Sequence, residues 1–227
     1  MHGGWEEGNG AYAQYVKVDK GLTIALPNKI SFEEGATLPL ASITAALVIF
    51  QQLGFPFPGQ GKKEVPFLVW GGASSVGMYA IQFANLAGAN VIAVASKNNH
   101  DLLKSLGASH TFDYRDADVI DQIKKASGGG VEYGIDTVSE AKTVAQCSKA
   151  YKSNGQIGLL LPVDKAQSGD SLTHKNVLMY AAVCFYLTVF LGIPSSITTL
   201  NSGHRVSQPI PRTTNLQSRP INWWQTF

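Results

Sequence analysis

The chain has 227 residues, enough to bury a full hydrophobic core in one large domain or in one domain with substantial flanks. It carries 18 Lys and Arg against 16 Asp and Glu, a formal charge of +2, and no run of basic residues. This excludes the concentrated positive surface of a nucleic-acid-binding protein. The two cysteines, Cys147 and Cys184, have no Cys or His companions at metal-ligand spacing, so we expect no metal site.

Two segments bear on where the protein resides. The polar, glycine-rich residues 1–7 lack the basic and apolar regions of a secretory signal, so we expect a cytoplasmic protein. Residues 177–193 contain no charge, and this run of 17 lies at the lower limit for a membrane span. We interpret it as buried strand and helix of a soluble domain. A membrane-associated protein is the less favoured alternative.

The N-terminal part predicts short strands followed by helix. Residues 10–26 alternate apolar and polar side chains, which is typical of two half-buried strands. Ser31 with Glu33 and Glu34 predicts a helix start before the apolar residues 36–53. Because proline lacks an amide hydrogen, we expect Pro39 to divide this stretch into two helices.

From residue 66 the chain alternates regularly between strand and helix patterns. The pattern predicts strands over 66–70, 91–95, 111–112, 133–137 and 156–161, and helices from near 76 and over 99–106, 117–126 and 141–149. Such alternation predicts an α/β fold of the Rossmann type, a doubly wound parallel sheet covered on both faces. The polar, aperiodic residues after 194 predict a disordered tail.

A glycine-rich turn separates the first of these strands from its helix. It comprises Gly71, Gly72, Ala73, Ser74, Ser75, Val76 and Gly77. Small residues allow a pyrophosphate to approach the backbone amides and the positive end of the helix dipole. The spacing departs from GxGxxG, and the alternative interpretation is a tight strand-to-helix turn without a ligand.

The next strand ends in Ser96, Lys97 and Asn99, about where the cofactor ribose should lie. An NAD site usually places Asp or Glu there, whereas a 2′-phosphate requires donors and positive charge. These residues offer donors and no carboxylate, which favours NADPH over NADH. The alternatives are a solvated lysine at a strand end and, for Ser96 and Asn99, a helix cap.

The joint pattern resembles the medium-chain dehydrogenase/reductase superfamily. The resemblance covers residues 10–182 and rests on residues 10–16, 26–36, 38–45, the turn, 106–108, 112–114, 134–137 and Gly155. In detail the sequence is most similar to zinc-independent enoyl and quinone reductases of the alcohol dehydrogenase-like type, above all the trans-acting enoyl reductases of fungal polyketide pathways.

The resemblance implies roles for individual residues. Ser74, Ser75 and Val76 would contact the pyrophosphate, Ser96, Lys97 and Asn99 the 2′-phosphate, Tyr114 the adenosine, Leu161 and Pro162 the nicotinamide, and Thr44 the nicotinamide or substrate. The residues alone support plainer alternatives, since Tyr114 could be a half-buried aromatic and the Thr44 hydroxyl could be satisfied within its own helix. Asp136, at a strand end, is interpreted as capping the next turn, so no catalytic residue is assigned.

The implied function is an NADPH-dependent oxidoreductase. It would transfer a hydride to the β-carbon of an enoyl thioester, enone or quinone, with protonation at the α-carbon, and a polyketide synthase is an expected partner. We expect residues 1–40 to be the remnant of a β-rich, GroES-like catalytic domain, 41–194 to be the NADP-binding domain and 195–227 a divergent tail, in a monomer or homodimer. The alternative is a truncated, non-catalytic nucleotide-binding module.

Overall fold

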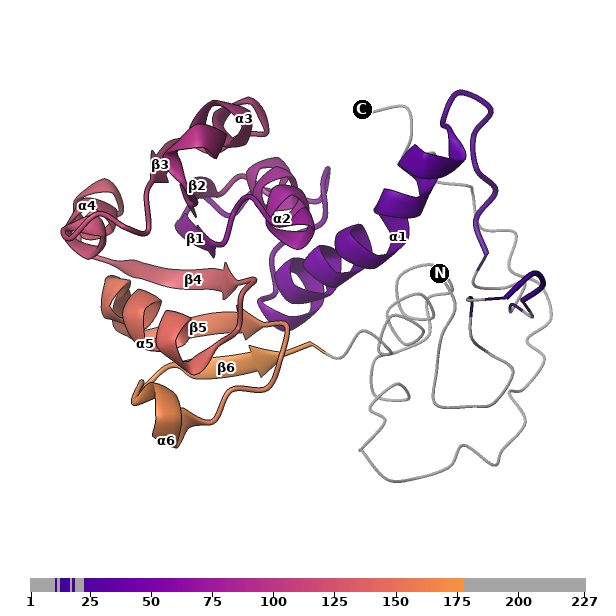
Figure 1. Ribbon diagram of the computed structural model, residues 1–227. Coiled ribbons are helices and arrows are strands. Elements are labelled where there is room, and N and C mark those ends of the chain that lie inside the picture. The colour runs from indigo at the N-terminus through magenta and orange to yellow at the C-terminus, as the bar shows by residue number, and fades with distance from the viewer. Residues whose placement is uncertain (1–10, 12, 17, 19–22, 178–227) are drawn as a thin grey trace.

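The computed structural model describes residues 11, 13–16, 18 and 23–177, and its centre is a six-stranded sheet (Figure 1). All five strand pairings are parallel, and the order is β3-β2-β1-β4-β5-β6. The strands are β1 (Pro66–Trp70), β2 (Asn90–Val94), β3 (His110–Phe112), β4 (Val131–Asp136), β5 (Tyr151–Leu159) and β6 (Thr173–Asn176). The predicted α/β class with a doubly wound parallel sheet is confirmed.

The helices connect these strands in alternation. They are α1 (Phe32–Ala46), which continues into the π-helical turn η2 (Leu47–Gln52), α2 (Ser75–Leu86), the 3₁₀ turn η3 (Lys97–Asn99), α3 (His100–Ser105), α4 (Val119–Ala126), α5 (Ala141–Cys147), the 3₁₀ turn η4 (Ser148–Ala150) and α6 (Lys165–Ser168). The expected helices near 76 and over 99–106, 117–126 and 141–149 correspond to α2, α3, α4 and α5 with small shifts at their ends.

The central strand β1 has buried side chains on both faces of the sheet. Phe67 and Val69 belong to the hydrophobic cluster that includes η2, α2 and α3. Leu68 and Trp70, which point the opposite way, belong to the cluster that includes α4 and α5. This explains why β1 has an uninterrupted apolar run rather than an alternating pattern.

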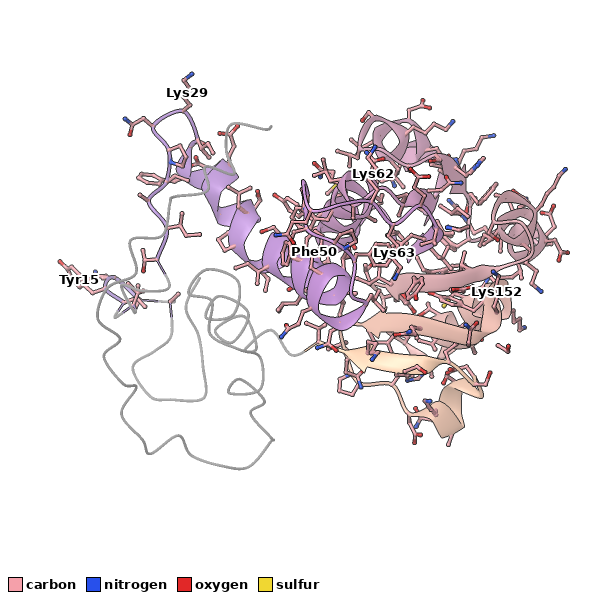
Figure 2. All side chains as sticks on the ribbon, turned by 180° about the vertical axis from the view of Figure 1, so that it is seen from behind. Tyr15, Lys29, Phe50, Lys62, Lys63 and Lys152 are labelled. Atoms are coloured by element: carbon pink, nitrogen blue, oxygen red, sulfur yellow. The ribbon has the colours of Figure 1, made fainter. Side chains whose placement is uncertain are left out.

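Helix α1 continues through Pro39, so the expected division into two helices is wrong. At its start, Ser31 and Glu34 form a reciprocal capping box. Past the proline, Leu47, Val48 and Ile49 are at most 1% exposed in the core. We attribute the continuity to this burial, which outweighs the roughly 3 kcal/mol cost of an internal proline. Figure 2 shows Phe50, at the end of this helical segment, where the segment meets the sheet domain.

The strands expected over residues 10–26 are absent from the described residues of that range, which are 11, 13–16, 18 and 23–26. A strand needs a hydrogen-bonding neighbour, and no described strand pairs with this segment. Tyr15 is 91% exposed and lies far from the sheet, as Figure 2 shows. At the other end, α6 and β6 are two elements that the sequence pattern did not predict.

One described helical segment, Phe32–Gln52, is long and apolar enough to cross a membrane by length and composition, and 39% of its most apolar window is buried. Its C-terminal half lies in the sheet domain's core. Of the uncharged run 177–193, only Val177 lies inside the described residues, where it is buried.

Candidate nucleotide-binding site

The glycine-rich turn joins β1 to α2 at the carboxyl edge of the sheet, where β1 lies between β2 and β4. The amides of Gly71 and Gly72 both donate to the carbonyl of Val94, at 3.0 and 2.9 Å, which ties the turn to the end of β2. Gly71 has φ +77°, and a Cβ atom there would collide with the Thr137 hydroxyl. A side chain at this position is therefore disfavoured by both conformation and space.

The first turn of α2 presents unpartnered amides at the positive end of the helix. Ser74 is the N-cap, and its Oγ accepts a hydrogen bond from the Gly77 amide at 3.0 Å. Within the described part of the chain, the amides of Ala73, Ser75 and Val76 have no hydrogen-bond acceptor. Three such donors beside a helix N-terminus suit a phosphate group.

Thr137 is a structural member of this turn that the sequence analysis missed. Its Oγ1 donates to the carbonyls of Trp70 and Gly71, at 3.1 and 2.9 Å, and accepts from Ser74 Oγ at 2.8 Å. One hydroxyl thus joins the ends of β1 and β4 to the cap of α2. The available signal was its position immediately after β4, since the carboxyl ends of neighbouring parallel strands meet at one edge.

The predicted 2′-phosphate residues lie in the turn after β2. Asn99 Nδ2 donates to Ser96 Oγ at 2.9 Å, and Lys97 is exposed. Ser96 stands at the N-cap position of η3, but its side chain makes no capping hydrogen bond. The cap interpretation therefore does not account for this hydroxyl.

A carboxylate also reaches this corner, from β3 rather than from β2. Asp113 Oδ2 accepts from the Lys97 amide at 3.1 Å, and Oδ1 accepts from the Arg115 amide and Nε at 3.0 and 3.1 Å. These hydrogen bonds, with those to Arg115 foremost, lower the pKa of Asp113. Sequence reasoning missed both Asp113 and Arg115, because it searched for an acidic residue only at the end of the second strand.

Tyr114 stands between these two residues and is 46% exposed. The Arg115 guanidinium carbon lies 5.2 Å from the Tyr114 ring centroid, within reach of a cation–π contact. The Tyr114 backbone carbonyl accepts a long hydrogen bond, 3.4 Å, from the Gln146 side chain of α5. The ring is thus an exposed aromatic face beside the Lys97 turn.

The ends of β4 and β5 form the other half of the edge. Asp136 is fully buried, and it accepts from Thr143 Oγ1 at 2.6 Å and from the Val138 amide at 2.9 Å. Burial, the largest effect, raises the pKa of this carboxyl. Ser139 Oγ donates to the Asp136 carbonyl at 2.7 Å and accepts from the Leu160 amide at 2.8 Å. Asp136 accordingly holds the turn before α5.

The residues expected at the nicotinamide differ in their surroundings. Leu161 and Pro162 are exposed and follow β5 after one residue, Leu160. Thr44 is buried in α1, and its Oγ1 donates to the Leu40 carbonyl at 2.7 Å. Its hydroxyl is therefore satisfied within its own helix.

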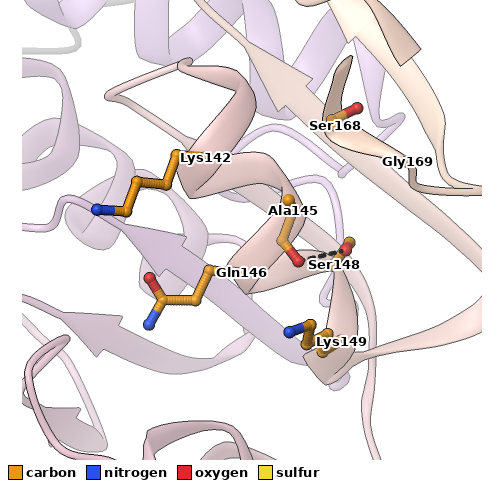
Figure 3. A pocket seen from close by; sticks show the side chains of 7 residues that line it. All are labelled: Lys142, Ala145, Gln146, Ser148, Lys149, Ser168 and Gly169. Atoms are coloured by element: carbon orange, nitrogen blue, oxygen red, sulfur yellow. Dashed lines mark hydrogen bonds between the residues drawn. The ribbon is translucent and has the colours of Figure 1, made fainter. Parts of the chain in front are cut away.

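A separate cavity of about 490 Å³ lies beside α5 and α6 (Figure 3). It is lined by Lys142, Ala145, Gln146, Ser148, Lys149, Ser168 and Gly169. None of these residues belongs to the glycine-rich turn or to the Ser96–Asn99 corner. Within the described ranges, no group of three or more His, Cys, Asp and Glu side chains could hold a metal ion.

Comparison with known proteins gives consistent matches. The zinc-binding dehydrogenase family matches residues 75–183. A zinc-type alcohol dehydrogenase-like protein of Schizosaccharomyces pombe is 39% identical over 170 residues, covering 70% of this chain and 49% of that protein. A trans-enoyl reductase of a Fusarium species is 36% identical over 160 residues, covering 69% of this chain and 45% of that protein.

The fold also matches solved structures. An NAD-dependent alcohol dehydrogenase superposes with a TM-score of 0.63 at 27% identity, covering 81% of this chain and 55% of that one. The chain spans about half the length of the curated relatives it matches. These matches, together with the parallel sheet and its glycine-rich turn, show that the chain belongs to the medium-chain dehydrogenase/reductase superfamily.

Proposed function

We propose that this chain binds NADPH at the carboxyl edge of its sheet and that it is a reductase of activated carbon–carbon double bonds. The observation that carries the proposal is the set of unpartnered amides of Ala73, Ser75 and Val76 beside the Lys97 turn. The amides suit the pyrophosphate, and the Lys97 charge suits a 2′-phosphate. Gly71 and Gly77 add no side chain to the turn, so that its backbone and the start of α2 can pack closely together.

Each residue then has a binding or orienting role. Ser74 and Thr137 fix the turn so that its amides point at one site, and Tyr114 offers a face for the adenosine. Leu161 and Pro162 would border the nicotinamide ring, which supplies a hydride when the cofactor is bound. The protein's contribution is to hold that ring in a fixed position at the edge of the sheet.

The substrate class is inferred from relatives. The Fusarium relative is named a trans-enoyl reductase, and so are relatives from Aspergillus and other fungi. We therefore propose an enoyl thioester, an enone or a quinone as substrate, with a polyketide synthase as the source of an enoyl chain. The structural neighbour named as NAD-dependent makes the choice of nucleotide the first matter to test.

Binding of NADPH and of NADH to the purified chain tests the nucleotide. Fluorescence titration and the shift in thermal unfolding midpoint should both give saturable binding that favours NADPH, because a ligand stabilises only the state that binds it. Equal binding of the two nucleotides would contradict the NADPH assignment. Binding of neither would contradict the nucleotide site itself.

Turnover tests the second part of the proposal. Loss of NADPH absorbance on addition of short enoyl thioesters or quinones would support an enzyme. The rival function is nucleotide binding without turnover. Saturable NADPH binding with no oxidation in either substrate class would establish that rival.

A further inference from the structure

One carboxylate holds two neighbouring loops together at the corner proposed for the 2′-phosphate. Asp113 Oδ2 accepts from the amide of Lys97, after β2, while Oδ1 accepts from the amide and Nε of Arg115, after β3. The Asp113 side chain is 13% exposed, whereas that of Arg115 is 61% exposed. The backbone of the Lys97 turn and the Arg115 guanidinium are therefore bound to the same group.

Arg115 retains free donors in this arrangement. A guanidinium has five N–H groups, and Asp113 accepts from only the one on Nε. In the described residues the terminal nitrogens of Arg115 have no acceptor, and its side chain is 61% exposed. The guanidinium also lies near the Tyr114 ring, which restricts its position. A fork of unused donors beside Lys97 matches the geometry of a phosphate group.

We propose that Arg115 determines specificity for the cofactor's 2′-phosphate and that Asp113 is the positioning residue that orients both Arg115 and the Lys97 turn. This inference rests on the proposed function and names two residues to which the resemblance gave no role. It also assigns the Asp113 carboxylate a role other than accepting a hydrogen bond from the ribose of NADH.

The negative charge of Asp113 and its positioning of the two loops predict opposite effects on phosphate binding. The hydrogen bonds from Arg115 and Lys97 lower the pKa of Asp113, and its proximity raises the pKa of Arg115, so both groups stay charged at neutral pH. If charge alone mattered, removing this carboxylate would strengthen binding of a 2′-phosphate by removing repulsion. If Asp113 acts by positioning, its removal weakens that binding, because both loops lose their anchor.

Calorimetric titration of the full chain with adenosine 2′,5′-bisphosphate and with AMP separates these effects. The two probes differ by the 2′-phosphate, so the ratio of their affinities measures its recognition directly. We expect Arg115→Ala to reduce this ratio by about ten- to a hundredfold with AMP binding unchanged. Arg115→Lys should give an intermediate ratio, since it keeps the charge without the planar fork.

Asp113→Ala should also reduce the ratio. Lys125→Ala on α4, which removes the same positive charge as Arg115→Ala but at an exposed site away from this corner, should leave the ratio unchanged. If the wild type prefers the bisphosphate and Arg115→Ala does not alter that preference, the inference is wrong while the proposed NADPH site stands. An increased ratio in Asp113→Ala would likewise overturn the positioning role. If the wild type binds both probes equally, or neither, the proposed NADPH specificity fails and the inference with it.

Discussion

Gly77 and Gly35 both lie in helices, but a methyl group at these two positions would contact different atoms. At Gly77 it would meet backbone atoms, and at Gly35 it would meet a side chain. At Gly77, a Cβ atom would collide with the Gly71 carbonyl oxygen and approach Gly72 Cα to 2.9 Å. At Gly35, its nearest neighbour would be Leu26 Cδ1 at 2.7 Å, the mobile end of a side chain. Only the first contact lies within the turn that would bind phosphate.

We expect Gly77→Ala to lower the free energy of unfolding by about 1–3 kcal/mol, because the turn and α2 must separate to admit the methyl group. Gly35→Ala is the matched control. It should be neutral or stabilising by up to about 1 kcal/mol, since Leu26 can move and alanine favours helix. Urea denaturation monitored by circular dichroism measures both, and an equal effect at the two sites would refute the backbone explanation.

At the scale of elements, two buried serine hydroxyls hold the opposite ends of β4. Ser139, after the strand, connects the Asp136 carbonyl to the Leu160 amide at the end of β5. Ser127, before the strand, donates to the Ile123 carbonyl at 2.8 Å and accepts from the Gly130 amide at 3.0 Å. The two groups have similar surroundings, but only the first lies at the carboxyl edge.

Alanine at either serine should cost about 1–3 kcal/mol of stability, because a buried amide loses its acceptor. Only Ser139→Ala should also change nucleotide binding, since Leu160 precedes the segment proposed to border the nicotinamide. We expect its NADPH affinity to fall relative to that for adenosine 2′,5′-bisphosphate, which lacks the nicotinamide half. The same fall in Ser127→Ala would show that general loss of stability, not position, is the cause.

At the scale of the whole molecule, the sheet domain, in which a strand followed by a helix is repeated, was predicted from the sequence. From β1 to β5, each strand or helix corresponds to a separate apolar run or periodic pattern in the sequence, and parallel strands connected by helices lead to one topology. The turn at Gly71 was recognisable for the same reason, as small residues between a strand and a helix. The edge strand β6 was missed because its four residues, Thr173–Asn176, are largely polar and carry no buried pattern.

The remaining errors concern interactions between distant parts of the chain. Asp113 and Lys97 are 16 residues apart, and only the pairing of β2 with β3 brings them together. Thr137 reaches Gly71 across 66 positions for the same kind of reason. The behaviour of Pro39 depends on how much apolar surface follows it in α1, which local propensity does not contain. A local pattern therefore locates the site's loops but not the side chains that connect them.

The pH dependence of folding provides a test of the whole domain through one buried carboxyl. Burial raises the pKa of Asp136 above its ordinary value of 3.8. As pH rises from that value, the unfolded chain releases this proton while the folded chain retains it, so the folded state loses stability until the pH exceeds the folded pKa. Asp170 has a lowered pKa and contributes with the opposite sign, but it is common to wild type and variant and cancels in their difference.

We therefore expect the stability of Asp136→Asn relative to wild type to increase with pH above about 4 and then level off, because the amide cannot ionise. Asparagine can still accept from the Val138 amide through Oδ1 and can donate to Thr143 Oγ1, so the turn before α5 keeps its hydrogen bonds. Asp121→Asn, on the exposed side of α4, makes the same change in net charge and is the matched control. Urea unfolding at a series of pH values measures both differences. A flat difference for Asp136→Asn would mean that its hydrogen bonds from Thr143 and Val138 offset burial completely, and that the carboxylate at the end of β4 is ionised in the folded protein at no cost.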